Sequence, residues 1–200
     1  PLQMANEIHS IIWSFTYAVG MAISGFIVNW YGVKTAFIID ALIFTIALIV
    51  FIRIDFVVKA SIATDKFFEL IKDGFRYIKN DKIILHLIFL HSSVGLTSFD
   101  ALITILAKNE YKYVISVPLA IGISNAVRAV ALMFGPIFIS KYVTKQNLHY
   151  LLIFQGIAII LWGLMQDNFY VSLIALFIVG LSTTTLWSFT YALLQDKCDE

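Results

Sequence analysis

The sequence predicts an all-α membrane protein, a polytopic bundle of six helices that each cross a lipid bilayer. Hydrophobic residues make up 60% of the 200 residues and charged residues only 14%, and the mean hydropathy is +0.88. A soluble domain has roughly 25% charged residues. The apolar residues also gather into stretches of about 20 residues, the length that a helix needs to cross ~30 Å of hydrocarbon. These stretches are residues 10–31, 35–52, 83–107, 114–140, 148–165 and 169–194.

Basic residues are distributed unevenly among the connections between these stretches. Ten of the 14 Lys and Arg residues lie in residues 53–82, in residues 141–147 or after residue 194, whereas three lie in the alternate connections. Because basic connections remain on the cytoplasmic side of a membrane, we expect residues 53–82 and both chain ends there. The net charge of +1 does not suggest a nucleic-acid partner, and a single cysteine, Cys198, excludes an internal disulfide.

The first stretch has a polar and aromatic face, and the second is apolar nearly all round. Trp13 and Tyr17 are four residues apart in the first stretch and therefore share one face of a helix. The second stretch holds Asp40 about five residues from its outer end. A carboxylate at that depth can reach the membrane interface, so we interpret Asp40 as a structural anchor.

The long connection, residues 53–82, contains a pattern typical of an amphipathic helix. Apolar residues recur there at helical spacing, and charged residues occupy the opposite face. The apolar residues are Phe67, Phe68, Ile71, Phe75 and Ile78. Such a helix can lie on the cytoplasmic surface of the membrane or pack under the bundle as a connector, and the sequence leaves both open.

The third and fourth stretches hold the polar residues that lipid tolerates least. One stripe follows the third stretch at steps of four, three and four residues: Ser93, Thr97, Asp100 and Thr104. The fourth contains Ser124, Asn125 and Arg128. A charge at the bilayer centre costs roughly 2.5–3.5 kcal/mol even on the milder scale, so we expect Asp100 and Arg128 to face protein or water and to be functional. For the hydroxyl groups, hydrogen bonding between helices is the alternative.

Asp100 and Arg128 are expected to touch. They lie on consecutive antiparallel stretches, at depths of ~10 Å and ~18 Å from the outer end. Helical side chains lean toward the N-terminus of their helix, so each of the two leans toward the depth of the other. Protonation of Asp100 would release Arg128, which would couple proton movement to a conformational step; a static structural pair is the alternative.

The fifth stretch is apolar apart from Gln155, and the sixth again has a polar face. The residues of interest in the sixth are Thr184, Trp187 and Tyr191. The stretches thus run polar, apolar, polar, polar, apolar, polar, as expected for a bundle around an aqueous cavity in which every third helix is peripheral. The six residues Trp-Ser-Phe-Thr-Tyr-Ala occur twice, at 13–18 and 187–192, and the sequence alone offers no reason for the repeat.

The sequence contains no signature of a soluble enzyme. It has no nucleotide-binding P-loop pattern and no His-Glu-x-x-His zinc pattern. His86 and His91 are five residues apart and therefore do not share a helix face, as a metal-binding pair would require. We expect no catalytic residue, no metal and no cofactor.

Several segments resemble the major facilitator superfamily. Residues 5–25 and 37–41 look like the fifth and sixth helices of its efflux branch, which includes siderophore exporters and drug/proton antiporters. Gly20-Met21-Ala22-Ile23-Ser24-Gly25 is similar to the antiporter motif G-P-x-x-G-G of that branch, with Met21 for proline and Ser24 for glycine. Residues 67–84 look like the segment before the seventh helix, and residues 140–145 keep the basic part of the turn after the eighth.

The resemblance implies a twelve-helix fold made of two six-helix halves, of which this chain would be a fragment carrying helices five to ten. Residues 1–52 would end the first half, residues 53–82 would be the cytoplasmic central loop, and residues 83–200 would begin the second half. The missing helices would complete the bundle. The cavity would be lined by Trp13, Tyr17, Ser93, Thr97, Thr104, Ser124, Asn125, Thr184, Trp187 and Tyr191, with Asp100 and Arg128 as the coupling or ion pair.

The implied function is secondary active transport across a bacterial plasma membrane, the inner membrane. The cargo would be a small amphipathic molecule moved outward by alternating access, with protons as the candidate coupling ion. An uptake symporter or a lipid carrier is the alternative within transport. A non-transporting membrane scaffold or receptor is the alternative from another class, and it predicts that the polar stripes are dry packing faces.

Overall fold

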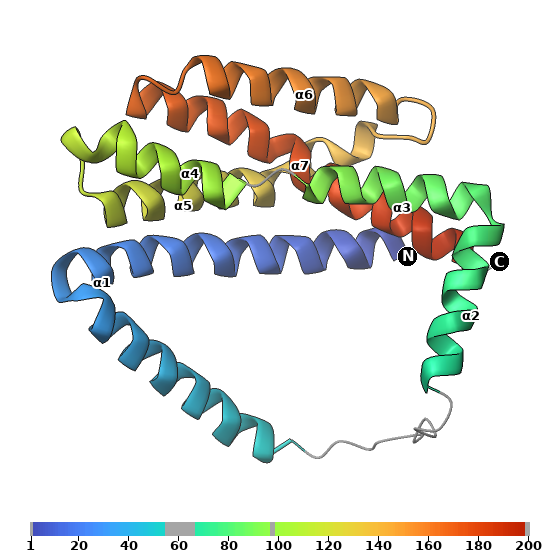
Figure 1. Cartoon of the computed structure of the whole chain (residues 1–200), viewed down its shortest axis with the longest axis horizontal. Helices are drawn as coiled ribbons and strands as arrows, with labels where there is room; N and C mark the ends of the chain where they lie inside the picture. The colour runs from blue at the N-terminus through green and yellow to red at the C-terminus, as the bar shows by residue number, and fades with distance from the viewer. Residues whose placement is uncertain (1, 55–66, 97–98, 199–200) are drawn as a thin grey trace.

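The computed structural model describes residues 2–54, 67–96 and 99–198, which form helices and short connections only (Figure 1). In chain order the elements are α1 (Leu2–Ile52), α2 (Phe67–Asn80), α3 (Lys82–Gly95), α4 (Phe99–Asn109), the 3-10 helix η2 (Tyr111–Tyr113), α5 (Val117–Phe138), the 3-10 helix η3 (Ser140–Tyr142), α6 (Leu148–Leu164) and α7 (Phe169–Cys198). No strand occurs in the three described ranges, and the predicted all-α class is confirmed.

Within the described ranges, four helical segments are long and apolar enough to cross a membrane. They are Met4–Ile52, Lys82–Asn109, Val117–Phe138 and Phe169–Lys197, and Leu148–Leu164 is a shorter apolar helix. The first of these covers two of the six predicted spans. α1 contains 51 residues and would be about 77 Å long if it were straight, more than twice the thickness of the hydrocarbon core.

α1 is divided into two arms at Gly32, within the predicted connection between the first two spans. Gly32 has φ 81° and ψ 167°, a conformation open essentially only to glycine. The first arm, residues 2–31, lies against the bundle, and the second arm, residues 33–52, diverges from it (Figure 1). No residue of the second arm is buried.

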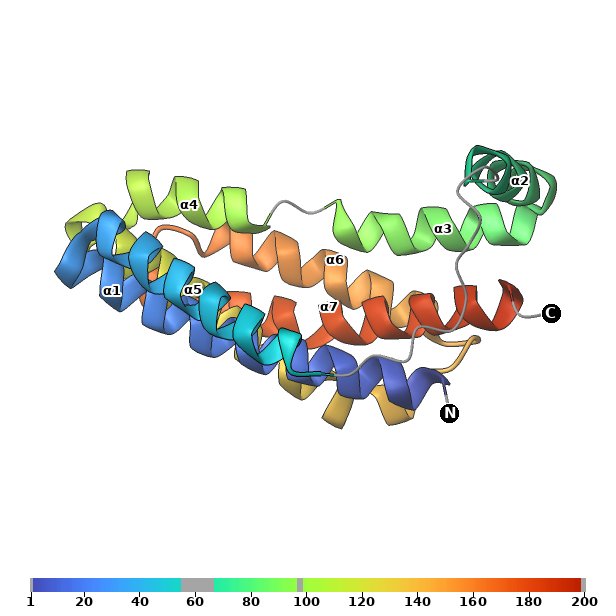
Figure 2. The same cartoon turned by 90° about the horizontal axis from the view of Figure 1, so that it is seen from below.

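The third predicted span, residues 83–107, falls within the candidate membrane segment Lys82–Asn109, whose described residues form α3 and α4. α3 ends at Gly95 and α4 begins at Phe99, and the two lie roughly end to end (Figure 2). Glycine is a weak helix former, and here Gly95 packs against a ring: a Cβ at this position would lie 3.3 Å from Trp187. Thr97, one of the predicted cavity residues, lies outside the described residues.

α5 is the central helix and packs against both α1 and α7, which also contact each other. Glycines permit both contacts. A Cβ on Gly122 would lie 2.8 Å from the carbonyl oxygen of Met21 and 2.9 Å from the Cα of Gly25, and a Cβ on Gly135 would lie 2.1 Å from the carbonyl oxygen of Leu181. The backbones therefore approach more closely than any larger side chain would allow.

The ends of the bundle agree with the alternation predicted from the basic residues. Both chain termini, α2 and the connection around η3 lie at one end, whereas the bend in α1, η2 and the turn before α7 lie at the other (Figure 1). α2 begins at Phe67, matching the predicted amphipathic helix, and it projects from the end of α3 away from the other helices (Figure 1). α6 packs on the outside of α7, so the two apolar spans are peripheral, as the sequence predicts.

Candidate functional site

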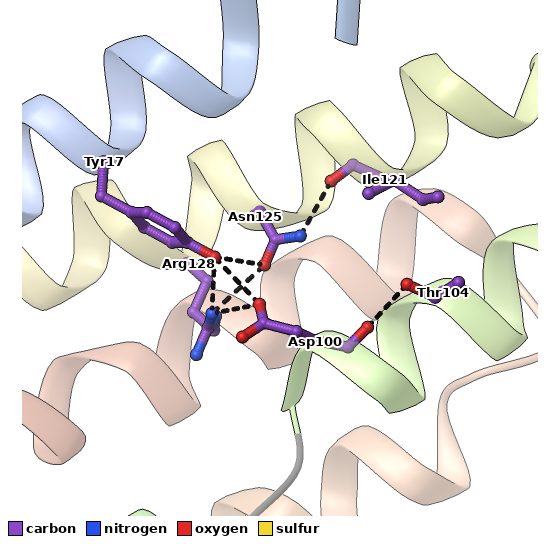
Figure 3. Close-up of polar contacts among 6 residues, drawn as sticks. All are labelled: Tyr17, Asp100, Thr104, Ile121, Asn125 and Arg128. Carbon is purple, nitrogen blue, oxygen red and sulfur yellow. Dashed lines mark hydrogen bonds and ion pairs between the residues drawn. The ribbon is translucent and has the colours of Figure 1, made fainter. Parts of the chain in front are cut away.

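Four polar side chains from three helices meet where α1, α4 and α5 come together (Figure 3). Arg128 Nη2 donates to Asp100 Oδ1 at 2.8 Å, to Asn125 Oδ1 at 3.2 Å and to the hydroxyl oxygen of Tyr17 at 3.2 Å. The Tyr17 hydroxyl donates to Asp100 Oδ1 at 2.9 Å and lies 3.3 Å from Asn125 Oδ1. The contact predicted between Asp100 and Arg128 is therefore present, and its role stays a prediction.

Helical spacing explains how the sequence assembles this network. Asn125 and Arg128 are three residues apart on α5 and so share a face, and the Asn125 amide is held in place by donating to the carbonyl of Ile121 at 3.2 Å. Asp100 lies in the first turn of α4, where the helix dipole favours a negative charge. Tyr17 lies next to Ala18, which is 8% exposed and packs in the interior of the bundle.

The two charges differ sharply in exposure. The Arg128 side chain is 9% exposed, whereas that of Asp100 is 71% exposed. The guanidinium also lies over the rings of Phe99 and Tyr17, 5.1 and 5.7 Å from their centroids, an arrangement that stabilises a cation. Its buried Nε has no hydrogen-bond partner in the described part of the chain. The charge that this site presents to its surroundings is therefore the carboxylate.

In the described ranges, the predicted cavity residues that carry aliphatic hydroxyl groups are satisfied locally or buried. Ser93 and Thr104 donate to carbonyls of their own helices, those of Leu90 and Asp100, at 2.7 Å each. Ser124 and Thr184 are buried, 3% and 6% exposed, which fits the helix-packing alternative rather than contact with a cavity.

The aromatic members remain accessible. Trp13 stacks on Tyr17 with ring centroids 5.1 Å apart, and Trp13, Trp187 and Tyr191 are 54%, 43% and 41% exposed. Of the predicted cavity residues in the described ranges, these three are the most exposed.

Three further predicted positions lie away from the network. Asp40 is exposed on the second arm of α1, and its role as an anchor stays a prediction. Gly25 packs against Gly122, whereas a Cβ on Gly20 would meet nothing within 4 Å. Of the two glycines in the motif-like segment, only Gly25 serves close helix packing.

The sequence analysis missed two residues of this region. Phe99 packs under Arg128, and the polar pattern of the third span gives no sign of this aromatic residue. The His91 ring lies 4.1 Å from Trp187 and 5.7 Å from Tyr191, centroid to centroid, and its Nδ1 is 2.9 Å from the hydroxyl oxygen of Thr190. The described residues contain no group of three or more His, Cys, Asp or Glu side chains that could hold a metal ion.

The chain was compared with protein families, curated proteins and solved structures. A family model described as Major Facilitator Superfamily matches residues 2–200. No curated protein and no solved structure matches the chain.

Proposed function

The chain belongs to the Major Facilitator Superfamily of secondary transporters, and we propose that it exports a small amphipathic molecule by alternating access, with proton coupling at Asp100. The observation that carries the proposal is the network in Figure 3. It joins Tyr17, which precedes the long connection, to Asp100 and Arg128, which follow it. In the twelve-helix arrangement these residues belong to different halves of the bundle.

A network that crosses between the halves can respond to protonation. Asp100 Oδ1 accepts hydrogen bonds from both Arg128 and the Tyr17 hydroxyl. A proton on the carboxylate would therefore weaken the contact with Arg128, within the second half, and the contact with Tyr17, between the halves. The proton would enter from the outer side when the site faces outward and leave when it faces the cytoplasm. The halves could then rock past each other around a site near the membrane midplane.

The outward direction and the membrane rest on sequence features. Residues 20–25 resemble the efflux motif, and the basic residues favour a cytoplasmic position for residues 53–82. The bacterial inner membrane is proposed from the resemblance to the efflux branch alone. The bilayer and the remaining helices of a twelve-helix bundle are the partners that this arrangement requires.

Substitution of the pair tests the proposal in the full-length protein. Proton-driven transport is measured in proteoliposomes for Asp100→Asn, Arg128→Gln and the double variant. Each single substitution should lower the rate roughly tenfold or more, because it leaves one polar partner in the membrane without its counter-charge. The double variant should be no worse than the worse single variant.

Asp196→Asn serves as the control, because Asp196 pairs with Lys145 at 3.4 Å on the exposed end of the bundle, where such pairs contribute little. Its rate should stay unchanged. Strictly additive losses at Asp100 and Arg128 would contradict a functional contact. Proton-driven transport that persists in the double variant would leave only a static structural role for the pair.

A further inference from the structure

An open groove of about 240 Å³ lies between η3 and the start of α6. This part of the chain belongs to the end of the bundle that carries both termini (Figure 1). Phe154, the last residue of the groove, lies about 9 Å along α6 from Leu148, whereas the headgroup layer of a bilayer is roughly 5–8 Å thick on each side. The groove therefore extends from headgroup depth into the hydrocarbon. Its lining residues are Tyr142, Val143, Asn147, Tyr150, Leu151 and Phe154.

The part of the groove on α6 is apolar and faces away from the bundle. Tyr150 and Phe154 are four residues apart and share one face of the helix, where they are 67% and 42% exposed. Leu151, 9% exposed, is the buried lining residue between them. Because α6 packs on the outside of α7, the exposed rings meet lipid. Tyrosine rings are favoured at this depth, since the ring is apolar and the hydroxyl is polar.

The charge around the groove is positive. Residues 141–165 contain two lysines and one histidine but no Asp or Glu. The Lys141 ammonium lies 4.9 Å from the centre of the Tyr142 ring, and the ring of His149 lies 4.0 Å from that of Tyr150, so both basic side chains stand against tyrosines of the groove. Lys145 pairs with Asp196 at 3.4 Å, whereas Lys141 has no carboxylate partner in the described part of the chain.

The polar rim of the groove is held in shape by Asn147. Its amide Nδ2 donates to the carbonyl of Tyr142 at 2.6 Å, and its Oδ1 accepts from the backbone N–H of Thr144 at 2.6 Å. The side chain is used in this turn and makes no capping hydrogen bond to α6. The positive end of the α6 dipole therefore lies at the rim beside Lys141, and both favour an anion there.

From these observations we infer that the groove binds an anionic glycerophospholipid of the adjoining leaflet, which is the cytoplasmic one in the orientation expected from the basic residues. The phosphate lies beside Lys141, and one acyl chain lies along Tyr150 and Phe154. A lipid is the occupant that supplies a negative group at headgroup depth and an apolar chain below it. The site is separate from the network of Figure 3 and goes beyond the proposed transport.

Photocrosslinking of the full-length protein tests the inference in vesicles of equal parts phosphatidylglycerol and phosphatidylcholine with identical acyl chains. The photoreactive residue p-benzoyl-phenylalanine replaces Tyr150 or, as a matched control, Tyr170. Both tyrosines are 67% exposed and lie in the first turn of a helix. Mass spectrometry of the adducts should show roughly fivefold enrichment of phosphatidylglycerol at position 150, the preference that one basic residue near a membrane surface confers, and none at position 170.

Two substitutions then separate the charge from the groove, each with the probe at position 150. Lys141→Gln should remove the enrichment, whereas Lys112→Gln should not, although Lys112 stands over the Tyr113 ring at the same 4.9 Å. Irradiation after purification into detergent should still link lipid at position 150 but not at position 170, because exchanging lipids are diluted away. Phe154→Ala should lower that retained adduct roughly fivefold through lost apolar contact.

Four results would overturn the inference. The first two are equal enrichment at positions 150 and 170, and enrichment that survives Lys141→Gln. The third is loss of enrichment in excess glycerophosphoglycerol, the headgroup without chains, which would indicate a water-soluble phosphate ligand. The fourth is linkage at position 150 to protein instead of lipid, which would mean that other helices or a second copy cover the groove. None of these measurements depends on transport, so they are distinct from a failure of the proposed function.

Discussion

The two arms of α1 are both apolar helices of membrane-spanning length, yet their surroundings differ completely. The first arm has buried residues at Ser14, Ala18 and Gly25 and hydrogen bonds to α4, α5 and α7. The second arm has no buried residue, and its hydroxyls at Thr35 and Thr45 donate to carbonyls of α1 itself. Since lipid tails are as apolar as leucine, hydrophobicity does not attract one helix to another in a membrane. Small and polar residues decide which arm packs.

The largest expected effect comes from blocking the close approach that holds the first arm. Gly122→Leu places a side chain where even a Cβ would lie 2.8 Å from a backbone oxygen. Overpacking of this kind should destabilise the bundle by about 3 kcal/mol, measured as the free energy of unfolding in mixed micelles. Gly20→Leu is the control, because a Cβ there meets nothing within 4 Å. Equal effects would mean that close packing does not distinguish the faces of the first arm.

A second substitution acts on the junction between the arms. Gly32→Ala has ample space, since a Cβ there meets nothing within 4 Å, but the backbone conformation excludes it. We expect a loss of stability of about 2 kcal/mol, measured by the same unfolding titration. The distance between labels on the two arms, measured by electron paramagnetic resonance, should change as well. An unchanged distance and stability would show that Gly32 does not set the divergence of the arms.

A smaller effect on the free energy of unfolding is expected when a hydrogen bond between two helices is removed, and none when a bond within one helix is removed. Ser10→Ala removes the contact of the first arm with Ser188 and should cost about 0.6 kcal/mol, the usual value for such bonds in membranes. Thr45→Val removes a bond of the second arm to its own Ala41 carbonyl. This substitution keeps the shape of the side chain, so it should change the free energy of unfolding by less than the experimental error. A larger loss from Thr45→Val would reverse the comparison.

The last prediction perturbs the protein least, because it reads the environment of each region directly. Spin labels on cysteines that replace Phe44 in the second arm and Phe75 in α2, both 71% exposed, should collide with dissolved oxygen, which concentrates in lipid. A label at Ser124, 3% exposed, should not. Low oxygen accessibility at Phe75 alone would favour the interpretation of α2 as a connector packed under the bundle rather than as a helix on the membrane surface.

Much of the helical framework was predictable because its causes are local. Span length follows from hydropathy, the amphipathic helix α2 follows from the spacing of its apolar residues, and the turn at Gly32 follows from the polar gap between two apolar stretches. The Asp100–Arg128 contact was also predictable, because depth along a helix and side-chain lean depend on residue number alone.

The remaining features depend on which helices become neighbours, which one sequence does not specify. The burial of Arg128 and the exposure of Asp100 follow from the position of Phe99 and Tyr17 around the guanidinium. His91 was missed because its partners, Trp187 and Tyr191, are about 100 residues away in the chain.

Gln155 has a mechanical consequence. It is 9% exposed on α6, its amide donates to the Thr183 hydroxyl at 3.0 Å, and its carbonyl accepts from Ser182 of α7. An apolar cylinder in oil can turn about its long axis at almost no cost, since each orientation shows lipid the same kind of surface. The hydrogen bonds of the Gln155 amide to the hydroxyls of Ser182 and Thr183 give α6 one preferred rotation relative to α7. A rotation of α7 about its axis would therefore also rotate α6, and the two helices would move as one rigid unit.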